Sequence, residues 1–217
     1  MPAIVGMLVN ALYNMVDRVF IGRGVGALAI SGLAVGFPLS IINMAFGMLI
    51  GIGSSTMISI KLGEKKKDEA ERILGNALVL IILISICLSI IGLIFLDDIL
   101  KIFGASQETL PYARDYMKYI MAGALLQNIG FGMNNIIRAE GNPKIAMATM
   151  LIGAIINIIL DPIFIFVFKM GIKGAAIATI FAQTVSSIWV LYYFFSGKST
   201  LKIKRENLSL HKGTIKT

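Results

Sequence analysis

Two aspartates, Asp17 and Asp161, lie inside stretches that are otherwise apolar over about the length of a membrane span. An acidic side chain at the centre of a bilayer costs roughly 2.5–3.5 kcal/mol on insertion scales, so such residues are usually functional. Asn157 precedes Asp161 by four residues, which places both side chains on one face of a helix. Oxygen ligands of this kind suit a hard cation, and two nearby carboxylates can also share a proton. The residue types therefore predict a site for a cation, a proton or a cationic substrate.

Arg18 offers a structural alternative, because an arginine next to Asp17 could neutralise it. Neighbours in sequence do not face each other on a helix, and a long arginine near the end of a span can extend to the interface. A second alternative is that both aspartates only accept hydrogen bonds at helix ends. We favour the functional interpretation, since intramembrane acids are functional by default.

The composition predicts a membrane protein. Hydrophobic residues make up 57% of the chain and charged residues only 15%, whereas soluble domains have about 45–50% apolar and about 25% charged residues. A helix needs about 20 apolar residues to cross a bilayer. Four runs with at most one charge meet that length: 73–96, 119–137, 145–168 and 174–196.

The N-terminal region supplies two further spans, over residues 2–22 and 31–61, joined by a surface connection at 24–30. A hairpin that turns at Pro38 is the alternative for the second span, but no cluster of turn residues surrounds this proline. We therefore predict an all-α, polytopic membrane protein, in which six transmembrane helices form one lobe (residues 1–196). Residues 197–217 are predicted to be a basic cytoplasmic tail or linker.

The distribution of basic residues orients these spans, because cytoplasmic loops carry an excess of Lys and Arg. One side has Lys61, Lys65, Lys66, Lys67, Arg72, Arg138, Lys144, Lys198, Lys202, Lys204, Arg205, Lys212 and Lys216. The other side has only Arg23, Lys101, Arg114, Lys118, Lys169 and Lys173. Both termini are predicted to be cytoplasmic, and the basic tail is predicted to contact anionic lipid rather than nucleic acid.

Several residue types needed for enzymatic chemistry are missing. The single cysteine, Cys87, lies in an apolar run, and the single histidine, His211, lies in the basic tail. The phosphate-binding and hydrolase motifs are also absent. We therefore predict that the protein is not an enzyme, needs no cofactor and holds no metal beyond a cation at the acidic site.

The predicted topology brings the polar residues to one depth in the membrane. With a rise of about 1.5 Å per residue, Asp17, Asp161 and Thr179 lie roughly 7–10 Å from the outer ends of three different spans. Two prolines interrupt the backbone of predicted spans, one in the fifth span and one in the second. Pro162 removes the helix hydrogen bond to the carbonyl of Ile158, and Pro38 acts likewise in the second span. Both prolines are predicted hinges.

Four runs resemble a known family. They are LYNMVDRVFIG (12–22), RAEGNP (138–143), NIILDPIF (157–164) and GIKGAAIAT (171–179). In this order they resemble the first half of the multidrug and toxic compound extrusion (MATE) transporters, in particular the bacterial branch with NorM-, MepA- and DinF-like exporters.

The resemblance implies a twelve-helix antiporter with two six-helix lobes, of which this chain covers the N-terminal lobe. It also implies export of small cationic or amphipathic compounds across the cytoplasmic membrane of a bacterium, in exchange for sodium ions or protons. Asp17, Asn157, Asp161 and Thr179 match the cation site of the N-terminal lobe. Further candidates to face its cavity are Gln127, Asn134 and Asn135.

The length of the chain leaves no room for spans 7–12, so we expect a fragment of a longer protein whose partner is the C-terminal lobe. Two alternatives stay open. A lipid-linked or polysaccharide flippase of the same superfamily would line its cavity with basic residues, and the spans offer only Arg18. A six-helix membrane subunit without transport activity would need no further lobe.

Overall fold

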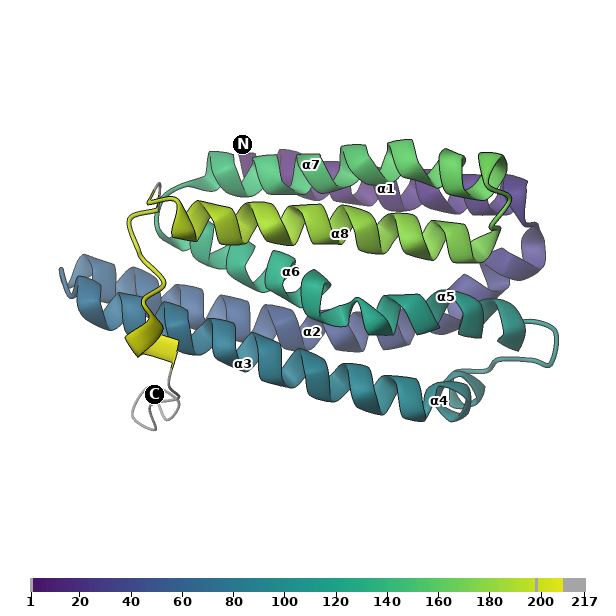
Figure 1. Ribbon diagram of the computed structural model, residues 1–217, viewed down its shortest axis with the longest axis horizontal. Coiled ribbons are helices and arrows are strands. Elements are labelled where there is room, and N and C mark those ends of the chain that lie inside the picture. The colour runs from purple at the N-terminus through teal and green to yellow at the C-terminus, as the bar shows by residue number, and fades with distance from the viewer. Residues whose placement is uncertain (1, 198, 209–217) are drawn as a thin grey trace.

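The computed structural model describes residues 2–197 and 199–208, and every regular element in this part of the chain is helical (Figure 1). The long helices are α1 (Pro2–Gly24), α2 (Ala27–Gly63), α3 (Lys67–Ile94), α7 (Pro143–Pro162) and α8 (Ile172–Phe195). The shorter elements are α4 (Leu96–Ile102), α5 (Leu110–Ala122), α6 (Ala124–Ala139), the π-helix η1 (Ile163–Val167) and the 3₁₀-helix η2 (Arg205–Leu208).

The helices form an elongated bundle in which α5 and α6 together make one broken rod (Figure 1). Helix α2 packs against α3, α5 and α6, and α7 packs between α1 and α8. Helix α6 also contacts α3 and α8, so it joins the two groups. The α2–α3 turn, the α6–α7 turn, the start of α1 and the end of α8 all lie toward one end of the bundle (Figure 1).

Four helices of the described chain are long and apolar enough to cross a membrane: α2, α3, α7 with η1, and α8. The all-helical prediction is confirmed, and the six-span topology stays a prediction. We predicted a single span over residues 119–137 for the fourth crossing. The structure instead divides that region between α5, with 13 residues, and α6, with 16.

The predicted connection at residues 24–30 is too long. Helix α2 already begins at Ala27, because Gly26 adopts a φ of 111° and completes the turn between α1 and α2 in two residues. Helix α2 then continues through Pro38 to Gly63 without a break, so no hairpin forms at the proline.

The fourth span also differs from its predicted bounds of 119–137. Helix α5 begins at Leu110, with a proline in its first turn, and carries Arg114 on its exposed side. The Arg114 Nε donates to Asp97 Oδ1 of α4 at 2.6 Å. The break at Gly123 lies against Ile180 of α8, where a Cβ has no room. Neither the break nor the short helix α4 has a signal in the hydropathy pattern.

Close helix contacts and one large apolar cluster hold the bundle together. The cluster contains fully buried side chains of α3, α6 and α8, among them Leu74, Met133 and Phe194. The Cβ of a residue at Gly51 would lie 2.7 Å from backbone atoms of Gly132, so α2 and α6 touch at their backbones. Small residues at such a crossing allow membrane helices to approach closely.

The predicted basic tail is not a free extension in its described part. Leu201 is fully buried in the main apolar cluster, and η2 packs against α3. The reason is that residues 199–208 carry apolar and backbone groups that complete the core as well as basic side chains. Residues 198 and 209–217, which include His211, lie outside the described residues.

Candidate functional site

Helices α1, α7 and α8 bring together the four residues predicted to form the cation site. The Asn157 Nδ2 donates to Asp161 Oδ1 at 3.2 Å and to Thr179 Oγ1 at 3.4 Å. The carboxyl groups of Asp17 and Asp161 lie within hydrogen-bonding reach of each other. Asp17 is 6% exposed, Asn157 2% and Asp161 0%, so the site is shielded within the bundle.

Three oxygens of this site are buried and accept no hydrogen bond from the described residues: Asp17 Oδ1, Asn157 Oδ1 and Asp161 Oδ2. A buried polar atom without a partner costs about 1–3 kcal/mol, and more when it is charged. A proton between the carboxyl groups, or a small cation bound by these oxygens, would remove that cost. Among the described residues no three His, Cys, Asp or Glu side chains form a group that could hold a metal.

Arg18 does not neutralise Asp17 directly. Its side chain is exposed, and its guanidinium lies over the ring of Phe37 at 5.3 Å from the ring centre. Among the ion pairs of the described residues, none joins Arg18 to Asp17. The arginine is positioned by an aromatic ring instead, which leaves the Asp17 carboxyl group directed toward Asp161.

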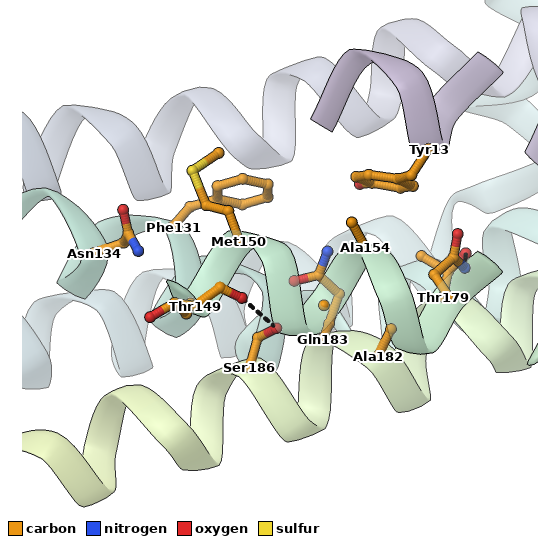
Figure 2. A pocket seen from close by; sticks show the side chains of 13 residues that line it. Tyr13, Phe131, Asn134, Thr149, Met150, Ala154, Thr179, Ala182, Gln183 and Ser186 are labelled. Atoms are coloured by element: carbon orange, nitrogen blue, oxygen red, sulfur yellow. Dashed lines mark hydrogen bonds between the residues drawn. The ribbon is translucent and has the colours of Figure 1, made fainter. Parts of the chain in front are cut away.

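The site lies between two cavities. The larger, of about 320 Å³, is bounded by α1, α2, α5, α6 and α8, and Asp17 and Thr179 are in its wall. The smaller, of about 40 Å³, lies between α1, α6, α7 and α8, and Asn157 and Thr179 line it. Figure 2 shows Tyr13, Thr179 and Gln183 around this smaller space. Both cavities share these three residues and Phe131, so the site connects them.

The three further candidates lie along the cavities on α6. Gln127 lines the larger cavity, and its Oε1 accepts a hydrogen bond from Asn43 Nδ2 at 3.3 Å. Asn134 lines the small cavity and donates to the carbonyl of Ala146 at 2.9 Å. Asn135 and Asn134 also line a third cavity, of about 330 Å³, toward the α6–α7 turn.

Tyr13, Tyr116 and Gln183 are among the residues of the cavity wall that sequence reasoning missed. Tyr13 precedes Asp17 by four residues and Gln183 follows Thr179 by four, so helix periodicity could have found both. Tyr116 had no such signal, because it precedes the predicted fourth span, 119–137. Its hydroxyl lies within hydrogen-bonding reach of Thr179.

The backbone changes its helical form directly after Asp161. Helix α7 ends at Pro162, and residues Ile163–Val167 continue as a π-helix. Isolated π-helical turns often lie at functional sites. The role of Pro162 as a hinge stays a prediction, which drug export by a Pro162→Ala variant would test. Pro38 lies within a continuous helix, and its role as a hinge also stays a prediction.

Comparison with known proteins identifies the family. The MatE family model matches residues 2–163, and the chain therefore belongs to the MatE family. Members of this family are transporters and not enzymes, which confirms both the predicted resemblance and the prediction that the chain is not an enzyme.

Two relatives and one solved structure give the extent of the similarity. The chain is 32% identical over 201 residues to the multidrug export protein MepA of Staphylococcus haemolyticus, covering 93% of this chain and 44% of that protein. The corresponding values for MepA of Staphylococcus aureus are 30% over 203 residues, 94% and 45%. A crystal structure of MATE in the bent conformation matches with a TM-score of 0.90 and 30% identity, over 100% of this chain and 48% of that chain. The chain thus spans less than half the length of these relatives.

Proposed function

We propose that this chain is the N-terminal half of a multidrug exporter, which expels small cationic or amphipathic compounds in exchange for sodium ions or protons. The observation that carries the proposal is the acidic site beside a cavity. Asp17 and Asp161 face each other from α1 and α7 with unpartnered oxygens, next to a space of about 320 Å³. A cavity of this size lies at the lower end of the usual range for small-molecule sites, about 300–1,000 Å³.

In this proposal the coupling cation binds Asp17, Asn157, Asp161 and Thr179. Two adjacent carboxylates repel each other unless a proton or cation lies between them. Occupancy of the site would therefore change how closely α1 and α7 can approach. Since Asp17 and Thr179 of this site also line the larger cavity, a change at the acids alters the wall against which a substrate lies.

The composition of the cavity wall favours amphipathic substrates. Phe37, Ile41, Met44 and Phe131 provide apolar contact area, and methionine adapts to ligands of different shapes. Asp17 supplies a negative group to the same wall. The wall is therefore suited to an aromatic or aliphatic compound with a positive charge.

One observation favours the flippase alternative. Arg18 lines the larger cavity and Arg138 the third one, so two basic groups are available to an anionic lipid headgroup. The acids of the proposed cation site are more deeply buried than either arginine, and we therefore rank cation export first. Binding of an anionic lipid headgroup in place of an organic cation would reverse this order.

We further propose that α1 and the α5–α6 rod cross the membrane together with the four long apolar helices. In this topology the start of α1 and the end of α8 both face the cytoplasm. The excess of Lys and Arg in the α2–α3 turn and after α8 supports this orientation. A reporter enzyme fused after Lys67 is expected to report the cytoplasm, and one fused near Gln107 or Lys173 the outside. An outside signal at Lys67 would contradict the six-span topology.

Membrane vesicles that contain the complete exporter provide the test of function. We expect an imposed sodium or proton gradient to drive movement of a fluorescent organic cation such as ethidium, and vesicles without the exporter to show none. Imposing the sodium gradient alone and then the proton gradient alone identifies the coupling ion, because only the gradient of that ion drives transport. Transport that ignores both gradients would rule out antiport as the function.

A further inference from the structure

Two carboxylates at the end of the bundle where α8 finishes take no part in the proposed cation site. Glu71, on α3, is 2% exposed, and Glu140, which follows α6, has one oxygen fully shielded from solvent. Both bind the same stretch of chain, residues 199–208. Figure 1 shows this stretch leaving α8 and crossing to α3.

The first attachment point is the turn between α6 and α7. The Ser199 Oγ donates to Glu140 Oε2 at 2.6 Å and accepts from the Leu201 amide at 3.0 Å. Asn142, in the same turn, donates to the Tyr193 hydroxyl at 2.7 Å. Glu140 and Asn142 of the motif 138–143 therefore fasten the turn to the last part of α8 and to the segment that follows it.

The second attachment point is α3. The Lys202 amide donates to Glu71 Oε1 at 3.2 Å, and Lys204 Nζ lies 2.7 Å from Glu71 Oε2. The hydrogen bond with Glu71 raises the pKa of the Lys204 ammonium group. A Cβ at Gly75, one turn further along α3, would collide with the backbone carbonyl of Asn207. Helix η2 thus lies directly on the backbone of α3.

We propose that residues 199–208 are a clasp, which joins the α6–α7 turn to α3 and stays closed while the protein works. Between the two attachment points Leu201 is fully buried in the core cluster, so opening the clasp would expose apolar surface and leave Glu71 without its partners. Both changes are unfavourable. The clasp joins α3, the α6–α7 turn and the end of α8 into one rigid body. It also fixes the place at which the chain after α8 leaves the bundle.

The proposal rests on the proposed function in one respect only. If a second half follows, the clasp is the attachment through which the two halves move against each other. The attachment itself can be tested without any transport assay.

Limited digestion with trypsin tests the closed state in the purified, full chain. We expect cleavage after Lys202 and Lys204 to be at least about tenfold slower than in the exposed α2–α3 turn at Lys65, because protease needs an opened segment. Gly75→Ala should remove most of this protection, since its Cβ displaces Asn207. Gly53→Ala, a matched helix position where a Cβ meets nothing within 4 Å, should leave the protection unchanged.

Glu71→Gln gives a second, milder variant that keeps the shape of the side chain and removes its charge. It should show intermediate protection while the elution volume on gel filtration stays that of the unsubstituted protein. Rapid cleavage after Lys202 in the unsubstituted protein would overturn the proposal. So would unchanged protection in both Gly75→Ala and Glu71→Gln.

A cross-link tests whether the clasp stays closed during transport. Ser199→Cys and Glu140→Cys, combined with Cys87→Ser, place two thiols at the first attachment point in the complete exporter. Export should be the same before and after oxidation if the clasp remains closed. Loss of export on oxidation, with recovery on reduction, would show that the clasp must open and would overturn the proposal. Failure of export in every variant would instead count against the proposed function, and the digestion results would still decide on the clasp.

Discussion

Asp161→Asn is expected to lower ion-driven export by about 10- to 100-fold. The substitution keeps the shape and most of the hydrogen-bonding capacity of the side chain but removes its charge. A hydrogen bond to a charged group contributes about 1.5–3 kcal/mol, and each 1.4 kcal/mol corresponds to about tenfold in an equilibrium constant. Asp17→Asn should have an effect of similar size, because both carboxylates face the same site.

The measurement is export of a fluorescent cation under the coupling gradient, normalised to the amount of protein in the membrane. Asp98→Asn is the matched control, since it makes the same chemical change at an exposed position on α4. The double variant separates a shared site from two independent ones. For a shared site, the loss in the double variant should be much smaller than the product of the two single losses.

A purely structural role for the two aspartates leads to the opposite result. The asparagine variants would then insert as well or better, because a neutral group avoids the cost of burying a charge, and export per molecule would not change. Such a result would remove Asp17 and Asp161 from the mechanism and leave the cavity without its proposed ion site.

Gly51→Ala is expected to be the most damaging single methyl group that can be added to the bundle's central crossing. The new Cβ would lie 2.7 Å from the Cα and carbonyl oxygen of Gly132. A backbone cannot move aside as a flexible side chain can, so α2 and α6 must separate. Overpacking of this kind typically costs about 1–3 kcal/mol. The apparent melting temperature of the purified protein in detergent should fall accordingly.

Gly53→Ala is the control on the same helix. Its Cβ meets nothing within 4 Å, so only the gain in helix propensity remains, up to about 1 kcal/mol. The two variants should therefore shift the melting temperature in opposite directions. Equal shifts would mean that α2 and α6 do not touch at Gly51 and Gly132 in the protein.

The sequence by itself determined the class of protein and the residues of the acidic site. Long uncharged runs cannot fold in water at this composition, and hydropathy alone therefore identifies the long helices. Asp17 and Asp161 were identifiable because a charge inside such a run is costly. Asn157 and Thr179 followed from helix periodicity, from the depth that a constant rise per residue assigns and from the match to the family's motifs.

Only the tertiary structure decided how the helices are interrupted and what their polar groups touch. The break at Gly123 lies against Ile180 from another helix, and Tyr116 reaches the site only because α5 begins much earlier than the hydropathy pattern indicates. The position of residues 199–208 was equally hidden. In the sequence that segment is notable only for its basic residues Lys202, Lys204 and Arg205. Its docking depends instead on Leu201 and on Glu71, which lies more than a hundred residues away. Hydropathy along the sequence identifies the polar side chains that are costly to place in a membrane. Contacts between segments that are distant in the sequence decide which of these side chains lie together.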